Sequence, residues 1–246
     1  MHFYAIGDIH GHFHLLTEAH ERIAEDMARH GPAPIIHLGD LCDRGPDSAG
    51  VIEYLRLGIA EGEDWVVLKG NHDRLFTQFL NDPSWADPGL RAVYSWLHPA
   101  LGGAATLASY GVHAPQDRPV VAVHADALAA VPQAHRDFLE SRPTSHPIAE
   151  ALCVHAGIRP GVALDAQVEQ DLIWIRKEFL EDPTDHGALI IHGHTAIAEA
   201  THYGNRLNLD SSAAYGGPLS AAVIEGRHAW LLTETGRQPI PYAWDR

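Results

Sequence analysis

The feature that most constrains this chain is a set of five segments in which a short apolar run is followed at once by a loop rich in glycine, histidine and aspartate. These segments are residues 6–11, 38–45, 69–73, 154–157 and 191–195. Apolar runs separated by amphipathic stretches predict the strands and helices of an α/β sheet. Because sites in such sheets form where strands end and loops begin, we expect the polar side chains of the five loops to share one site.

The periodicity of the chain predicts the order of its elements. In the first part we expect strands at residues 2–6, 33–38 and 65–68 and helices at 13–29 and 47–57. Residues 74–146 predict a helical or irregular cap, with helices at 73–80, 90–97 and 135–140 and a glycine-rich turn region at 101–111. In the last third we expect strands at 149–154, 188–191, 198–202, 206–210, 219–225 and 228–233.

The last two strands favour a hairpin with Gly226 at its turn, and the close spacing of the C-terminal strands favours antiparallel pairing. The whole pattern predicts an α/β fold in one domain, residues 1–246. Its expected architecture is a four-layer α-β-β-α sandwich of two mixed sheets, with the site at the carboxyl ends of the strands.

Composition narrows the function classes. The chain has 17 basic and 32 acidic residues and a formal net charge of −15, which argues against nucleic acid or an anionic membrane as a partner. We expect no signal peptide and no transmembrane helix. Two cysteines, Cys42 and Cys153, are too few for a disulfide framework, so we expect them to be reduced and buried in a cytoplasmic protein. The oligomeric state is left open.

The residue types in the five loops suit a pair of divalent cations. The oxygen and nitrogen donors are Asp8, His10, Asp40, Asn71, His155 and His192. Asp8 and His10 stand two residues apart on one loop, and the carboxylate of Asp40 is able to bridge two ions. Such a set without sulfur suits Mn, Fe, Zn or Ni. Taken singly, each residue is better explained as a turn residue, a helix cap or a buried histidine, but their joint occurrence after successive strands favours a metal site.

The motifs resemble those of the calcineurin-like metallophosphoesterases, and more narrowly the bacterial phosphoprotein phosphatases. The matching segments are Gly7-Asp8-Ile9-His10-Gly11, Gly39-Asp40-Leu41-Cys42-Asp43-Arg44-Gly45, Gly70-Asn71-His72-Asp73, Val154-His155-Ala156-Gly157, Trp174-Ile175-Arg176, His192-Gly193-His194-Thr195 and Asn208-Leu209-Asp210. The resemblance extends over nearly the full length. It departs from eukaryotic relatives at Asp73, where they usually have Glu, and in the segment from Gly102 to Gly111.

The resemblance implies a dinuclear centre, with manganese the most expected metal. One ion would be held by Asp8, His10 and Asp40, and the second by Asp40, Asn71, His155 and His192. A hydroxide shared by the ions would attack phosphorus in line, without a phospho-enzyme. His194 is expected to contact the ligands rather than to bind metal.

The resemblance also implies the catalytic and phosphate-binding residues. His72 would protonate the leaving oxygen while Asp43 holds its ring. Arg44 and Arg176, together with Asn71, would hold the phosphoryl oxygens. Alternatives remain open: Asp43 as a cap for the helix that begins near Pro46, Arg176 as an ordinary helix-end arginine. Arg74 is expected at the surface.

The motifs leave three alternative functions. The leading one is hydrolysis of phosphomonoesters, with phosphoserine and phosphothreonine in proteins as the expected substrates. The second is a symmetrical dinucleoside tetraphosphate hydrolase, whose motifs are shared. The third is a scaffold that keeps the fold without catalysis, which predicts a missing ligand or acid, whereas the six expected ligands and His72 are all present.

Overall fold

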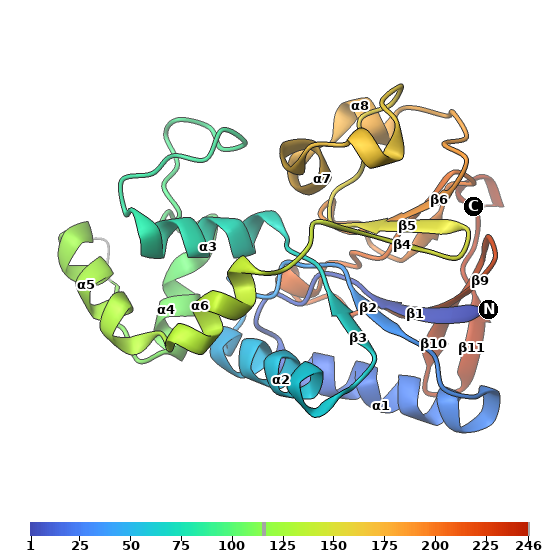
Figure 1. Ribbon diagram of the computed structural model, residues 1–246, viewed down its shortest axis with the longest axis horizontal. Helices are drawn as coiled ribbons and strands as arrows, with labels where there is room; N and C mark the ends of the chain where they lie inside the picture. The colour runs from blue at the N-terminus through green and yellow to red at the C-terminus, as the bar shows by residue number, and fades with distance from the viewer. Residues whose placement is uncertain (115–116, 246) are drawn as a thin grey trace.

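The computed structural model describes residues 1–114 and 117–245 and contains two β-sheets between layers of helices (Figure 1). The six-stranded sheet, called sheet A, has the strand order β11-β10-β9-β1-β2-β3. Its strands are β1 (His2–Ile6), β2 (Ile35–His37), β3 (Trp65–Val67), β9 (Ala221–Glu225), β10 (His228–Thr233) and β11 (Gly236–Pro239). The central strand β1 pairs in parallel with β2 and antiparallel with β9, so sheet A is mixed, as predicted.

The five-stranded sheet, called sheet B, has the order β4-β5-β6-β8-β7. Its strands are β4 (Ser145–Ile148), β5 (Ala151–Val154), β6 (Leu189–His192), β7 (Thr201–His202) and β8 (Arg206–Asn208). The expected antiparallel pairing holds for β9 and β10 but is wrong for β6 and β8, which pair in parallel. The reason is that the chain first crosses to the outer edge, forms β7, and returns to place β8 beside β6.

The alternation of side chains along the strands produces the layers. On β1, Phe3 and Ala5 face sheet B and share an apolar cluster with Ile191 of β6. Tyr4 and Ile6 point the other way, into the cluster that packs against helices. The two sheets therefore bury their facing sides on each other and their outer sides under helices. This is the predicted four-layer arrangement.

Different helices cover the two outer faces (Figure 1). The helices that cover sheet A are α1 (Phe13–His30) and α2 (Ser48–Glu61), and those over sheet B are α7 (Glu169–Trp174) and α8 (Lys177–Leu180). Short 3-10 turns occupy Leu164–Ala166, Ala213–Tyr215 and Ala243–Asp245. The helices α7 and α8 and the strands β4 and β11 were not predicted, because each is short and carries little periodicity of its own.

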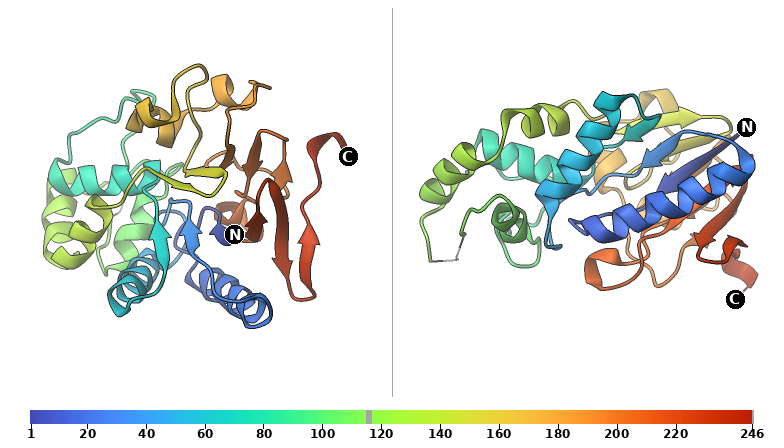
Figure 2. Two further views of the ribbon diagram at one scale, coloured as in Figure 1. Left: turned by 45° about the vertical axis from the view of Figure 1, so that its right-hand side comes forward. Right: turned by 90° about the horizontal axis from the view of Figure 1, so that it is seen from below.

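Residues 71–114 and 117–140 form a helical group beside the sandwich, called the insertion (Figure 2). Its helices are α3 (Asn71–Asn81), α4 (Gly103–Ser109), α5 (Val120–Ala130) and α6 (Gln133–Glu140). The helix expected at 90–97 is absent, and successive turns occupy that stretch instead. The carboxylates of Asp82 and Asp87 accept backbone N–H groups two residues on, which favours turns over a helix start. The region expected as turns at 101–111 contains α4, bounded by Gly102 and Gly111 at φ of 85° and 78°.

The structure also bears on the expectations about the cysteines and about membrane-spanning helices. Both cysteines are buried and unpaired, as predicted. Within the described ranges, no helix combines the length and apolar character that a bilayer span requires. The assignment of residues 1–246 to one domain stays a prediction.

The buried carboxylate of Asp26, on α1, connects this helix to the first and last strands of sheet A, β1 and β11. Asp26 accepts a hydrogen bond from the hydroxyl of Tyr4 at 2.8 Å and from Arg237 Nη2 at 2.7 Å. Arg237 also donates to the half-exposed Glu225 at 2.7 Å. Burial by itself raises the pKa of Asp26, but the hydrogen bonds from Arg237 and Tyr4 outweigh it and hold the pKa below its usual range.

We expect Asp26→Asn to lower the free energy of unfolding at pH 7 by about 1–3 kcal/mol, since a buried charged hydrogen bond is lost. A depressed folded-state pKa stabilises the fold above the unfolded-state value and stops doing so as the pH falls through the folded-state value. The difference between wild type and variant should therefore shrink in acid. Urea unfolding at a series of pH values measures it, and Glu225→Gln, at the exposed partner of the same arginine, should change stability by less than about 0.5 kcal/mol. A pH-independent difference would contradict this account.

Candidate metal centre and active site

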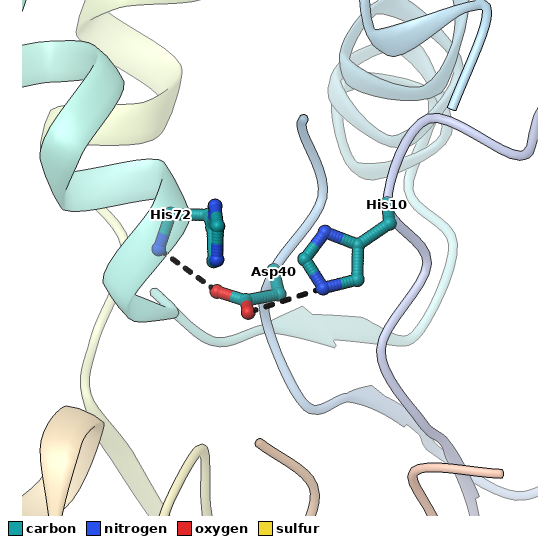
Figure 3. Close-up of side chains that lie close together, drawn as sticks. All are labelled: His10, Asp40 and His72. Carbon is teal, nitrogen blue, oxygen red and sulfur yellow. Dashed lines mark hydrogen bonds and ion pairs between the residues drawn. The ribbon is translucent and has the colours of Figure 1, made fainter. Parts of the chain in front are cut away.

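The carboxylate of Asp40 lies where four loops meet. Asp40 follows β2 and is 2% exposed. Its Oδ2 is 3.4 Å from Nε2 of His10, which follows β1, and its Oδ1 accepts the backbone N–H of His72 at 2.9 Å (Figure 3). Nε2 of His155, which follows β5, lies 3.3 Å from Oδ1. One carboxylate thus contacts residues from both sheets and from the start of α3.

Two imidazole rings are fixed by backbone carbonyls so that the other nitrogen faces Asp40. Nδ1 of His10 donates to the carbonyl of Cys42 at 2.8 Å, and Nδ1 of His155 donates to that of Leu38 at 2.9 Å. Nε2 of each ring then faces a carboxylate oxygen, and that of His155 also lies 3.0 Å from Oδ1 of Asn71. Nitrogen and oxygen atoms that converge in this way favour a positive charge between them, whether a proton, the guanidinium of Arg44 or a metal ion. The geometry therefore fits a bound cation.

Asp8 and His194 complete this group. Both carboxylate oxygens of Asp8 accept the backbone N–H of His194, at 3.2 and 2.9 Å. A Cβ at Gly193 would lie 1.8 Å from Oδ1 of Asp8, so only glycine allows this approach. Nε2 of the buried His194 has no hydrogen-bond partner among the described residues, which leaves an imidazole nitrogen free for an ion.

The electrostatics of the group also fit divalent cations. Burial raises the pKa of Asp8 well above its usual range, and Asp210 and Asp40 add to this because like charges oppose ionisation. Burial would lower the pKa of His155, but Asp40 and Asp8 outweigh it and raise the pKa to about 9. Nearby acids thus favour a positive charge at this place. Ligand atoms lie within 4.8 Å of one another in two sets, His10, Asp40 and His72, and Asp40, His155 and His194.

A histidine–aspartate pair stands beside this group. Nδ1 of His72 donates to Oδ2 of Asp43 at 2.6 Å, and both side chains are almost completely buried. The helix that follows Pro46 is capped by Asp47, which accepts the backbone N–H of Gly50 at 2.8 Å. Asp43 therefore does not serve as that cap, and its carboxylate faces His72.

The site opens to solvent through a small polar cavity of about 80 Å³. Its lining comprises His10, Asp40, Arg44, His72, Arg176, His194, Ala196, Asp210, Ala214 and Tyr215. The half-buried Arg44 reaches His10 Nε2 at 2.7 Å and His72 Nε2 at 3.0 Å. Arg176 is exposed and borders the same cavity, as does Tyr215, which is 68% exposed and lies under the Arg44 guanidinium.

Comparison with known proteins identifies the family of this chain. Residues 1–221 match the calcineurin-like phosphoesterases. The chain belongs to that family. A curated relative from Anoxybacillus flavithermus, bis(5'-nucleosyl)-tetraphosphatase PrpE [asymmetrical], is 27% identical over 98% of this chain and 96% of its own length. Serine/threonine-protein phosphatase 1 of Salmonella typhimurium is 29% identical over 91% of this chain and 92% of its own length.

The fold comparison agrees with the family. A crystal structure of a candidate diadenosine tetraphosphatase superposes with a TM-score of 0.62 and 22% identity, covering 94% of this chain and 92% of that chain. Members of this phosphoesterase family depend on a dinuclear metal centre, and the groups of donors around Asp40 are candidates for that centre here.

Within this phosphoesterase, His192 lies apart from the other expected ligands. Strand alternation places it on the same side of β6 as Ile190, towards the helices that cover sheet B, where its ring contacts Phe179. Its Nδ1 lies 3.0 Å from the Gly193 carbonyl and its Nε2 3.2 Å from Arg206. The structure instead brings His194 to Asp40 and His155. Leu189, Ile190 and Ile191 are all apolar and buried, so the sequence of β6 does not indicate which face His192 takes.

Arg74 is also placed differently from the expectation. It is 9% exposed rather than at the surface, and it pairs with Asp87 through two hydrogen bonds of 2.9 Å. It also contacts Glu169 and Gln170 of α7 at 3.3 and 2.8 Å. The arginine therefore joins α3, the turns of the insertion and α7. No local sequence signal distinguishes it from a solvent-exposed helical arginine.

The backbone is strained where these loops meet. Among the described residues, seven besides glycine have positive φ, and six of them lie in these loops or beside the cavity. The six are His10, Asp40, Asp43, Arg44, His194 and Ser212. Such conformations cost free energy and persist only when the surrounding structure fixes them, and they gather at functional sites.

We expect Mn²⁺ to raise the melting temperature of metal-free protein, because the ion binds the folded chain preferentially. At 100 times the dissociation constant the gain is about 2.7 kcal/mol. Asp40→Asn removes the charge that faces both imidazoles and should abolish most of that rise. Melting curves with and without Mn²⁺, combined with metal analysis, measure the effect. Asp64→Asn, at an exposed carboxylate before β3 at the opposite end of the sheet, should respond like wild type. An equal rise in Asp40→Asn would argue against the site.

Proposed function

We propose that this phosphoesterase is a metal-dependent phosphatase that hydrolyses phosphomonoesters, phosphoserine and phosphothreonine in proteins foremost. The observation that carries the proposal is the shared cavity, in which Arg44, Arg176 and His72 surround the donors around Asp40. A volume of about 80 Å³ admits a group of a few heavy atoms, such as a phosphoryl group, and leaves the rest of a substrate outside. The similarity to the Salmonella serine/threonine phosphatase supports the protein substrate.

The proposed ligands are Asp8, His10, Asp40, Asn71, His155 and His194, with His194 taking the place first given to His192. Two divalent cations, with Mn²⁺ the most expected and Fe, Zn or Ni as alternatives, would lower the pKa of a water and offset phosphate charge when bound. The other steps fall to the chain itself. Arg44 and Arg176, assisted by Asn71, hold the phosphoryl oxygens.

Proton donation to the leaving group is assigned to His72. A water oxygen attacks phosphorus and gives up a proton to the solvent, while the phosphorus–oxygen bond opposite breaks and its electron pair stays on the leaving oxygen. That oxygen takes the proton from Nε2 of His72. Asp43 accepts the hydrogen bond from Nδ1–H of His72 throughout, which keeps Nε2 directed at the cavity, and Nε2 then regains a proton from the solvent.

We expect His72→Asn to lower kcat by about 10²- to 10⁴-fold, the usual contribution of a positioned acid. Metal content should stay close to that of wild type, because Asp40 and the other donors remain. Steady-state hydrolysis of p-nitrophenyl phosphate and metal analysis of the same sample measure both. His14→Asn, at an exposed histidine on α1, is the matched control and should leave kcat unchanged. Unchanged turnover in His72→Asn would exclude the role given to His72.

A second function is hydrolysis of dinucleoside tetraphosphates, supported by the similarity to PrpE over 98% of this chain. A panel containing a phosphoserine peptide and diadenosine tetraphosphate should separate the two, and we expect the higher kcat/KM for the peptide. The products identify the mode of cleavage, since symmetrical hydrolysis gives two ADP and asymmetrical hydrolysis gives ATP and AMP. A higher kcat/KM for the dinucleotide would overturn the protein substrate, and no turnover with any divalent metal would favour a non-catalytic scaffold.

A further inference from the structure

A segment of the insertion, far from Asp43 in sequence, surrounds the Asp43 carboxylate. Nε1 of Trp96 donates to Oδ2 at 2.9 Å, and the hydroxyl of Thr106 donates to Oδ1 at 2.7 Å. The same hydroxyl oxygen accepts the backbone N–H of Asp43 at 2.8 Å. Trp96 is 5% exposed, and Thr106 and Asp43 are fully buried. Three side chains thus donate hydrogen bonds to this carboxylate. His72 and Trp96 donate to Oδ2, and Thr106 donates to Oδ1.

The segment also holds the backbone of the turn. Asp43 and Arg44 have φ of 73° and 68°, and the N–H of Arg44 points to the carbonyl of Gly102 at 3.3 Å. A Cβ at Gly102 would lie 2.4 Å from that nitrogen, and one at Gly103 would lie 2.5 Å from the ring of Trp96. The two glycines therefore allow the start of α4 to approach the turn that carries Asp43 and Arg44. We call Trp96, Gly102, Gly103 and Thr106 the clamp.

We propose that the clamp positions the general acid: Trp96 and Thr106 fix the Asp43 carboxylate so that it orients His72 towards the leaving oxygen. This inference rests on the proposed phosphatase function and deepens it. The proposed metal ligands and phosphate-binding arginines give no function to the glycine-rich part of the insertion. The clamp gives it one. Trp96 and Thr106 act through Asp43 and are positioning residues.

The physical basis is the freedom of a carboxylate to rotate. His72 alone fixes one oxygen of Asp43, and a carboxylate with a single partner turns about its Cβ–Cγ bond at little cost. Trp96 on the same oxygen and Thr106 on the other remove that freedom. Catalytic groups lose much of their effect when displaced by about 1 Å. Loss of a clamp hydrogen bond should therefore reduce proton donation more than substrate binding.

The experiment compares variants that remove a donor with variants that keep it. Trp96→Phe keeps an aromatic ring against Phe76 and removes the N–H. Thr106→Val removes the hydroxyl, and Thr106→Ser retains it. Phe79→Leu, which disturbs packing against the same indole without removing a hydrogen bond, is the structural control.

The readout is the dependence of kcat on the leaving group in the Mn²⁺-loaded full chain. A proton donor matters most for a poor leaving group, so Trp96→Phe and Thr106→Val should lower kcat for phenyl phosphate by about tenfold or more and for 2,4-dinitrophenyl phosphate by less than about twofold. KM should change little, Thr106→Ser should restore activity, and Phe79→Leu should affect both substrates equally. Equal losses for both substrates in Trp96→Phe would overturn the proposal.

Two further measurements separate the clamp from the proposed function. Trp96→Phe added to His72→Asn should cause no further loss in kcat if the clamp acts through His72, and an independent loss would overturn it. In metal-free protein, the Nδ1 proton of His72 should give a low-field NMR resonance that disappears in His72→Asn and weakens or shifts in Trp96→Phe. An unchanged resonance in Trp96→Phe would overturn the clamp. Wild type without activity on any phosphomonoester would instead overturn the proposed function.

Discussion

The site depends on the carboxylate of Asp40, which is buried between charged and polar partners. Its two oxygens face two imidazoles and a backbone N–H, and these belong to loops from three different strands. Burial would raise the pKa of Asp40, but His155 and His72 outweigh it and hold the pKa well below its usual range. An ionised carboxylate at this depth is stable only with such partners. The relative placement of the two sheets at this edge therefore follows from electrostatics as well as from apolar packing.

Much of the fold was predictable because apolar runs and glycine-rich loops alternate along the chain. The strands that carry the first loops, β1, β2 and β3, were placed to within about two residues, and the donors on those loops lie together as the motif spacing indicated. Other parts were not predictable from local pattern. The helix expected at 90–97 has the right periodicity, but aspartate side chains before it compete for the backbone.

The candidate site, like the fold, was predictable from the sequence only in part. Asp8, His10, Asp40 and Asn71 follow from motifs whose loops come directly after strands. The choice between His192 and His194 required the direction of the His192 side chain at the end of β6 and the path of the following loop, which carries His194, and a motif alone gives neither. Trp96 and Thr106 lie 53 and 63 residues from Asp43, and only the packing of the insertion brings them together. Sequence patterns thus predicted which loops carry the donors and missed the residues of the insertion that contact Asp43.

The pairing of β1 with β9 has a consequence for how the chain acquires its site. Tyr4 pairs with Val223, so the centre of sheet A joins the two ends of the sequence. At a synthesis rate of about 5–20 residues per second, β9 leaves the ribosome roughly 11 to 44 s after β1. During that interval Asp8, His10, Asp40 and Asn71 are already available, whereas His155 and His194 follow later. A growing chain thus carries only part of the proposed donor set until late in synthesis, and the centre of sheet A is completed after that, when β9 pairs with β1.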